Sequence, residues 1–411
     1  MAVIRPFKAV RPEPRVAHLV ASVPYDVVNR KEAAELAKDN PINFLRVTRS
    51  EIELDKNIDA YDKRVYEKAK ENFERIKKEA PLIQDEEPRF YFYRLIWGDQ
   101  TQVGIAATFS VDDYNKDVIM KHEKTRKVKE DDRTNHIVTT AAQTGAVFLT
   151  YKGIDAVNEI VNTVMDKIDP VYDFTSNDSI RHTVWVVPDE YNETIQSEIG
   201  KAEKLYIADG HHRAASAARA QHVKKESNPN HTGEEEYNFF LAVLFPAEQL
   251  KILPYNRVVH DLNGNDEITF MEKVKNNFTV EESSSPVPTG KREIKMYLNN
   301  KWFSLKPNEN VKSGNTIGEN LDVGILQNYL LNPILGIEDP RTSDRIDFIG
   351  GIRGTGELEK LVNSGKAVVA FSMYPVSVDD LINVSDAGET MPPKSTWFEP
   401  KLRDGLVVHV I

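Results

Sequence analysis

One stretch of the chain, residues 204–225, constrains the fold more than any other. It begins with a short run whose leucine, tyrosine and isoleucine are typical of a buried strand, and the dipeptide Asp209-Gly210 is a turn signal that ends this run. The alanine-rich residues after the turn favour a helix, and their small side chains allow that helix to lie close to a sheet. The stretch therefore predicts a strand–turn–helix unit, with a histidine pair and an arginine in the first turn of its helix.

The turn has the sequence DGHHR and carries four side chains that suit the binding of an acidic ligand. Asp209 can take up a hydroxyl proton or bind a metal. His211 and His212 titrate near neutral pH, and Arg213 can grip a phosphate group in two places. The first turn of a helix adds unpaired backbone N–H groups and a positive macrodipole, which together favour phosphate. A polar capping turn is the alternative interpretation, but capping needs Asp209 alone and explains neither the histidines nor the arginine.

Further motifs are spread over almost the whole chain. They are IRPFKAVRP near the start, VPYDVV at 23–28, NPINFLRVTRSEI at 40–52, KHEKT at 121–125, DGHHR at 209–213 and MPPKSTWFEPKL at 391–402. With these motifs the chain resembles the bacterial family called domain of unknown function 1015. The DGHHR turn is similar to that of the ParB/sulfiredoxin-like superfamily, in which the archaeal free-serine kinase uses such a turn to hold the phosphates of its nucleotide. The resemblance implies a site for ATP or ADP, with Mg²⁺, at residues Gly210, His211, His212 and Arg213.

A second informative stretch, residues 121–133, packs four lysines, two arginines, one histidine and four carboxylates together without apolar periodicity. A charge run of this kind predicts a solvated loop outside the core. The alternative is a contribution to the site, because Glu123 stands beside His122 and Thr125. In the related serine kinase an upstream glutamate is implicated as the base that acts on the substrate hydroxyl. The resemblance therefore implies Glu123 as the base, and we assign His122 and Thr125 to the substrate.

Two loops that contain proline are further candidates for the site. Pro24 precedes Tyr25 and Asp26, a phenol and a carboxylate that we assign to the substrate, although an ordinary turn is the alternative. The loop 391–405 contains three prolines, which preset Lys394, Ser395, Thr396 and Lys401 for gripping an acidic ligand at little entropic cost. Of these residues we assign Lys394 to the nucleotide. Its alternative is a tail that covers the core and is anchored by aromatic side chains.

Strands and helices alternate between residues 147 and 225, after a β-hairpin predicted at 90–97 and 102–109 and a helix predicted at 133–144. This order predicts an α/β (mixed α+β) fold in which helices pack on a mixed sheet. The resemblance implies a ParB/sulfiredoxin-like catalytic or nucleotide-binding domain at 1–252, and we expect a smaller C-terminal α+β domain at 253–411, whose proline-rich loop returns to the site. The alternating region has neither the glycine pattern of a Rossmann fold nor that of a P-loop.

Composition excludes several functions. With 64 acidic and 53 basic residues the net charge is −11, which argues against sequence-independent binding to nucleic acid. The absence of cysteine excludes disulfides, thiolate metal sites and a cysteine nucleophile. No run approaches 18 apolar residues and the first residues lack the apolar centre of a secretory signal, so we expect a cytoplasmic protein without a membrane span. The oligomeric state is left open.

These features together predict a phosphotransferase, an ATP- or ADP-dependent kinase that acts on a small hydroxyl substrate such as serine. Because Asp209 is fixed at the strand end beside the phosphates, we assign it to metal or substrate positioning and Glu123 to the base. One alternative is a non-catalytic nucleotide-sensing regulatory protein of the same fold. Another is a hydrolase, either a phosphatase or a metallohydrolase with histidine ligands. Adjacent histidines on a helix do not readily face one metal, which disfavours the metallohydrolase.

Overall fold

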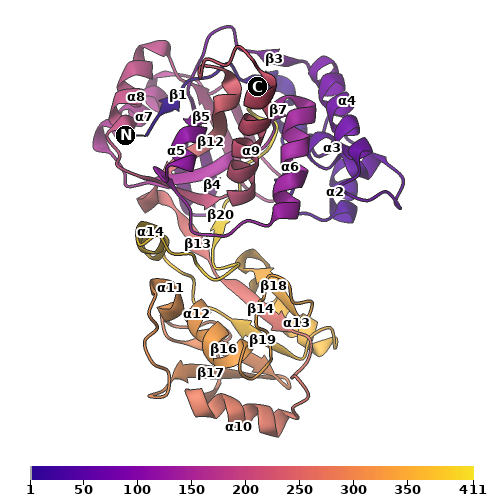
Figure 1. Cartoon of the computed structure of the whole chain (residues 1–411), viewed down its shortest axis with the longest axis vertical. Coiled ribbons are helices and arrows are strands. Elements are labelled where there is room, and N and C mark those ends of the chain that lie inside the picture. Colours follow the sequence, from indigo (N-terminus) through magenta and orange to yellow (C-terminus); the bar gives the residue numbers. More distant parts are fainter. Residues whose placement is uncertain (1) are drawn as a thin grey trace. The chain divides into compact units, whose positions relative to one another are not determined.

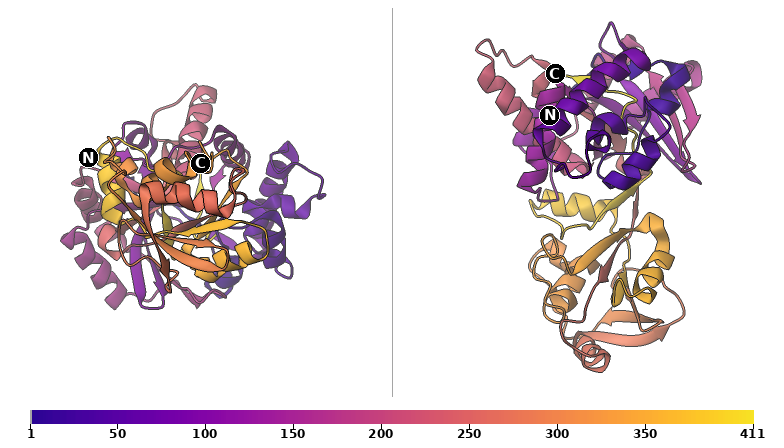
Figure 2. Two further views of the ribbon diagram at one scale, coloured as in Figure 1. Left: turned by 90° about the horizontal axis from the view of Figure 1, so that it is seen from below. Right: turned by 90° about the vertical axis from the view of Figure 1, so that its right-hand side faces the viewer.

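The computed structural model describes residues 2–411, which form two compact units (Figure 1). Each unit contains its own central sheet, and two further views of the same ribbon are given in Figure 2. The chain enters unit 2 twice and returns to unit 1 for its last residues. Unit 1 comprises residues 2–121, Thr125–Leu250 and Pro400–Ile411, and unit 2 comprises His122–Lys124 and Lys251–Glu399.

Unit 1 is built on a mixed sheet of nine strands. Their bounds are β1 (Ile4–Arg5), β4 (Tyr91–Trp97), β5 (Gln100–Ser110), β6 (Ile119–Met120), β8 (Val147–Tyr151), β9 (Tyr172–Thr175), β10 (Arg181–Val186), β11 (Leu205–Asp209) and β12 (Phe239–Pro246). The hydrogen-bonded order is β6-β11-β8-β12-β5-β4-β10-β9, with β1 also pairing with β5. The pairs β12–β8 and β11–β6 are parallel, whereas the other pairs are antiparallel. The predicted mixed sheet, including its β4–β5 hairpin, is confirmed.

Five helices of unit 1 share one hydrophobic cluster with the sheet: α5 (Val111–Asn115), α6 (Lys127–Thr140), α7 (Asp155–Lys167), α8 (Asn192–Gly200) and α9 (His211–Ser227). Alternate residues of β5, namely Ile105, Ala107 and Phe109, face this cluster because side chains of a strand alternate between its two sides. Helix α9 contributes Ala214, Ala217 and Ala220, which follow the spacing of one helical face. The alanine-rich segment is thus the buried helix that the sequence predicted.

The other helices of unit 1 are α1 (Ala17–Val20), α2 (Arg30–Ala37), α3 (Leu45–Thr48) and α4 (Lys63–Glu79). Val20, Val47 and Phe73, from α1, α3 and α4, meet in a second hydrophobic cluster. Short strand pairs join β2 (Val10–Pro12) to β3 (Leu82–Gln84) and β7 (Ala142–Gln143) to β21 (His409–Val410). The last strand therefore ties the end of the chain to unit 1.

Helix α6 corrects two predictions from the sequence. The charged stretch expected to be a solvated loop enters a helix at Lys127, six residues before the predicted helix start, and this helix ends at Thr140. Asp132 is buried, and it accepts hydrogen bonds from Arg133 and from the hydroxyl of Tyr66. Tertiary partners of this kind satisfy charged side chains that a sequence pattern assigns to solvent.

Unit 2 contains a sheet of six strands in the order β15-β17-β16-β19-β14-β18, in which all neighbours are antiparallel. The bounds are β14 (Tyr255–Val259), β15 (Phe278–Ser283), β16 (Ile294–Leu298), β17 (Lys301–Pro307), β18 (Ile346–Gly350) and β19 (Val369–Ser372). Its helices are α10 (Glu267–Asn277), α11 (Ile317–Asn320), α12 (Asp322–Leu326), α13 (Gly354–Asn363) and α14 (Val378–Asp386), and a π-helical turn at Gln327–Leu331 continues α12. A separate pair joins β13 (Lys251–Leu253) to β20 (Trp397–Glu399).

Within residues 2–411, no helix combines the length and the apolar character that crossing a membrane requires.

Candidate functional site

The DGHHR turn has the predicted strand–turn–helix geometry. Strand β11 ends at Asp209, and α9 begins at His211. Gly210 between them has φ 92° and ψ 31°, in the left-handed region. A side chain at this position would strain the backbone, so glycine permits the abrupt passage from strand to helix.

Helices α6 and α9 lie side by side and run in the same direction. Nε2 of His212 accepts a hydrogen bond of 3.0 Å from the backbone N–H of Arg126, the residue before α6. One turn further along both helices, Oγ of Ser216 donates to the carbonyl of Glu130 at 3.1 Å. The N-terminal ends of both helices therefore lie together, and their macrodipoles add positive potential at the same place. Because Nε2 of His212 accepts a hydrogen bond, it carries no proton in this arrangement.

Arg213 is almost fully enclosed, with 7% of its surface exposed. Its Nη2 donates to both carboxylate oxygens of Asp26, at 3.1 and 3.0 Å, and its Nη1 donates to the carbonyl of Ala146 at 2.6 Å. Burial alone would lower the pKa of Arg213, but the charges of Asp26 and Asp209 outweigh it and keep the guanidinium protonated. The predicted phosphate fork thus joins the Tyr25-Asp26 loop to the DGHHR turn in this conformation.

Asp209 forms an ion pair with a residue from the C-terminal segment of unit 1. Nζ of Lys401 lies 3.2 Å from Oδ2 of Asp209, and Nη2 of Arg213 lies 3.8 Å from the same oxygen. Burial alone would raise the pKa of Asp209, but the charges of Lys401 and Arg213 outweigh it and hold this pKa below its usual range. An ionised carboxylate with a low pKa is a weak general base at neutral pH and a suitable ligand for a cation.

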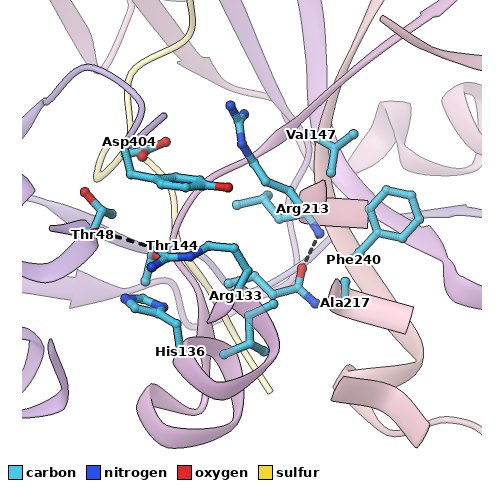
Figure 3. Close-up of a pocket in the computed structure, with 14 residues that line it drawn as sticks. Thr48, Arg133, His136, Thr144, Val147, Arg213, Ala217, Phe240 and Asp404 are labelled. Atoms are coloured by element: carbon cyan, nitrogen blue, oxygen red, sulfur yellow. Dashed lines mark hydrogen bonds between the residues drawn. The ribbon is translucent and has the colours of Figure 1, made fainter. Parts of the chain in front are cut away.

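A small cavity of about 30 Å³ lies behind the turn, among residues of unit 1 (Figure 3). Asp404 lines it, and burial raises the pKa of this carboxyl to about 7. Its Oδ2 and Nε of Arg213 are enclosed without a hydrogen-bond partner in the part of the chain that is described. In Figure 3, Arg133 extends toward Thr48, to whose carbonyl it donates at 3.3 Å. The volume suits one or two water molecules and is too small for a nucleotide.

The structure thus brings together several predicted site residues from distant parts of the chain. Arg213 contacts Asp26, and its Cζ lies 5.9 Å from the ring centroid of Tyr25, which is buried. His211, two residues before Arg213, is also buried. Thr125 belongs to unit 1 as well, and its hydroxyl donates a hydrogen bond to the carboxylate of Glu130.

Three other predicted site residues belong to unit 2. His122 is buried, and its carbonyl accepts a hydrogen bond of 2.8 Å from the N–H of Met391. Lys394 is exposed and has φ 57°. Glu123 lines a pocket of about 430 Å³ within unit 2, together with residues that include Glu319, Glu338, Asp339 and Arg341.

Sequence reasoning did not single out the residues that the C-terminal segment brings to the turn. Both Lys394 and Lys401 were named in the proline-rich loop and Lys394 was assigned to the site, whereas Lys401 pairs with Asp209. Asp404, three residues further, lines the cavity with Arg213. The motif that contains Lys401 was the signal that the sequence offered. It marks the segment, but nothing in it indicates which lysine lies near the turn.

A metal site composed of protein ligands alone is not present in residues 2–411, since no three histidine, aspartate or glutamate side chains group suitably. A magnesium ion that arrives with a nucleotide needs less, because phosphate oxygens and waters supply most of its ligands. The ionised carboxylate of Asp209 at the helix ends fits that requirement.

Three solved structures resemble the chain at low sequence identity. A conserved hypothetical protein from Pyrococcus furiosus is 12% identical, with a TM-score of 0.38 over 74% of this chain and 95% of the other. A free serine kinase in complex with AMP is 12% identical, with a TM-score of 0.38 over 74% of this chain and 91% of the other. SbnI from Staphylococcus aureus, with a C-terminal truncation, is 12% identical, with a TM-score of 0.39 over 74% and 86%.

No curated protein matches the chain. At the level of the family the assignment is clear, because the sequence pattern of one family extends over residues 4–324, which is most of the chain and includes the DGHHR turn. The chain belongs to the family described as protein of unknown function (DUF1015).

Proposed function

We propose that this protein is a phosphotransferase, an ATP- or ADP-dependent kinase of a small hydroxyl substrate such as serine. The observation that carries the proposal is the convergence of two helix N-termini, α6 and α9, beside the ion pair of Asp209 and Lys401. Phosphoryl transfer depends mainly on positioning and on the neutralisation of phosphate charge. Paired helix ends, a histidine and a lysine are suited to both tasks.

Within this proposal the DGHHR turn binds the nucleotide. Gly210 and the first backbone N–H groups of α9 receive the phosphates, with His211 and His212 beside them. Asp209 holds the magnesium ion that accompanies the nucleotide, a role that its low pKa supports. When bound, the ion would neutralise phosphate charge. Arg213 keeps the turn and the Asp26 loop together.

The remaining predicted residues are assigned to the acceptor and the base. Asp26 is suited to the acceptor, because 39% of its side chain is exposed while Arg213 holds it from the buried side. Tyr25, His122 and Thr125 stay proposed substrate residues, and Lys394 a proposed nucleotide residue. We propose Glu123 as the base that takes the hydroxyl proton, because the low pKa of Asp209 disfavours that role for the other carboxylate. Unit 1 would then be a ParB/sulfiredoxin-like nucleotide-binding domain, and unit 2 a smaller α+β domain.

A nucleotide-sensing protein without turnover is the second candidate, since the same helix ends and histidines serve binding alone. A phosphatase would use the same phosphate cradle with water as the acceptor. The two differ from a kinase in what they release: the sensor consumes no nucleotide, and the phosphatase yields free phosphate without an acceptor.

The first experiment is a thermal-shift measurement with ATP, ADP and pyrophosphate, each with and without Mg²⁺. A ligand at one hundred times its dissociation constant stabilises the folded protein by about 2.7 kcal/mol, which a melting curve resolves. We expect His212→Ala to lose this shift. His222→Ala is the matched control, because His222 lies on the same helix with 71% of its side chain exposed and, within residues 2–411, pairs only with Glu226, at 3.2 Å.

A phosphate-transfer assay over small hydroxy acids and amino acids then separates the candidates. Transfer to one of these acceptors supports the kinase. If none of the three ligands changes the melting temperature of the intact protein, the phosphate-cradle interpretation is abandoned for all candidates.

A further inference from the structure

A buried arginine in unit 2 has no acidic partner. Arg257 lies on β14 with 3% of its surface exposed, and no carboxylate of the described residues comes within ion-pair distance of its guanidinium. Lys295, on β16 of the same sheet, is equally buried at 4%, but its Nζ lies 2.9 Å from Oε1 of Glu293. A buried charge without a counter-charge is costly, so its presence calls for a cause other than the stability of the fold.

The surroundings of Arg257 are polar and aromatic, but they do not neutralise its charge. The guanidinium donates to the carbonyls of Tyr255 and, at 3.2 Å, of Lys394. Its Cζ lies 5.5 Å from the ring centroid of Phe348. A guanidinium has five N–H groups, and these two carbonyls take two of them. Burial lowers the pKa of Arg257 to about 10, as expected for a cation that lacks a nearby anion.

The loop that covers Arg257 adds a second cation. Nζ of Lys394 lies 5.6 Å from the ring centroid of Tyr255, the ring that neighbours Arg257 along β14. Lys394 has φ 57°, a left-handed conformation that costs energy for a residue with a side chain. Oγ of Ser395 fixes the turn by donating to the carbonyl of Pro392 at 2.5 Å. The strained, fixed loop thus keeps a lysine and a buried arginine around one tyrosine.

We propose that Arg257 anchors an oxyanion-binding site in unit 2, which takes the carboxylate or phosphate group of a small molecule. Lys394 lies at the edge of this site, a role that replaces its assignment to the nucleotide. The oxyanion supplies the counter-charge that the fold does not, and the planar guanidinium suits a bidentate contact with either group. The proposal goes beyond the phosphotransferase, because it concerns binding at a site in unit 2 and holds whether or not the protein transfers phosphate.

The test compares the melting temperatures of the full chain and its variants in sodium phosphate and in sodium glycolate, with ionic strength held constant by sodium chloride. We expect phosphate or glycolate to raise the melting temperature of the wild type by roughly 5 °C near saturation. The anion that does so identifies the group recognised. Arg257→Met should lose the part of this response that remains in His212→Ala. It should melt no lower than the wild type without anion, because it removes an uncompensated buried charge.

Lys295→Met is the matched control. It leaves the carboxylate of Glu293 buried without its lysine, so it should melt lower than the wild type and still respond to the anion. Arg257→Lys keeps the charge but not the fork, and it should respond more weakly. His212→Ala should keep the full response to the anion at Arg257, which separates this site from the DGHHR turn.

Two results would overturn the proposal. One is a wild type whose melting temperature rises no more in phosphate or glycolate than in sodium chloride. The other is an unchanged anion response in folded Arg257→Met, which would make Arg257 a purely structural residue. Should Arg257→Met not fold, Arg257→Lys decides, because an undiminished response in that variant contradicts recognition by the guanidinium fork.

Discussion

Replacing Arg213 by methionine should destabilise unit 1 far more than removing an ordinary surface ion pair. The guanidinium of Arg213 is buried, contacts both oxygens of Asp26, and lies 3.8 Å from Asp209. Its charge also lowers the pKa of Asp404, which burial otherwise raises. Methionine fills a similar volume but leaves these carboxylates without their shared cation.

The structure sets the expected size of the effect. Breaking a buried pair by removing one partner costs about 3–5 kcal/mol, because the remaining charge is left uncompensated. The estimate belongs toward the lower end, because Asp26 is partly exposed and Asp209 keeps its ion pair with Lys401. Arg181 provides a matched comparison in the same unit. It also makes a two-pronged contact with an aspartate, Asp173, but 49% of its side chain is exposed, so its loss should cost about 0.2–1 kcal/mol.

The measurement is urea unfolding of the wild type, Arg213→Met and Arg181→Met, followed by tryptophan fluorescence and far-ultraviolet circular dichroism. Trp97 and Trp185 lie in unit 1 and Trp302 and Trp397 in unit 2, so the emission includes the unfolding of both units, and the two arginine variants identify the part that belongs to unit 1. With an m-value of about 3 kcal/mol/M, a loss of 3 kcal/mol lowers the unfolding midpoint by about 1 M. The reasoning is refuted if Arg213→Met shifts the midpoint no more than Arg181→Met does.

Three further outcomes are expected. Burial raises the folded pKa of Asp404 to about 7, so the stability that its protonated form contributes is lost as the pH rises from about 4 through about 7. The unfolding free energy of the wild type relative to that of Asp404→Asn should therefore be higher at pH 5 than at pH 8, and an equal difference at both pH values contradicts this. Gly210→Ala forces a side chain onto φ 92°, so it should lower the free energy of unfolding in urea by about 1–2 kcal/mol and should also weaken nucleotide binding. An unchanged free energy of unfolding would count against the strained turn. In phosphate-transfer and nucleotide-binding assays, Glu123→Gln should lower turnover by about 10²–10⁴-fold with nucleotide affinity near wild type, whereas Asp209→Asn should lower both turnover and affinity. The reverse pattern exchanges the roles of base and of metal or substrate positioning, and full activity in both variants removes these carboxylates from the mechanism.

Local sequence determined the element on which the candidate site is built. The strand, the turn at Gly210 and the alanine-rich helix were all predictable, because burial of a short apolar run, a positive φ at glycine and helix propensity each depend on a few consecutive residues. The mixed sheet was predictable for the same reason, from a hairpin followed by alternating strands and helices. The ParB/sulfiredoxin-like assignment and the division into a catalytic and a C-terminal domain stay predictions.

Only the tertiary structure decided which charged side chains are buried and with whom they pair. Asp132 was expected in a solvated loop, but a tyrosine and an arginine satisfy it within a helix. Lys401 and Lys394 lie in one motif, yet the lysine that pairs with Asp209 is Lys401. Arg257 carries no signal in the sequence, because the absence of a counter-charge is a property of its surroundings. Propensity and periodicity act over neighbouring residues, whereas the pairing of charges depends on segments that meet only when the chain has folded.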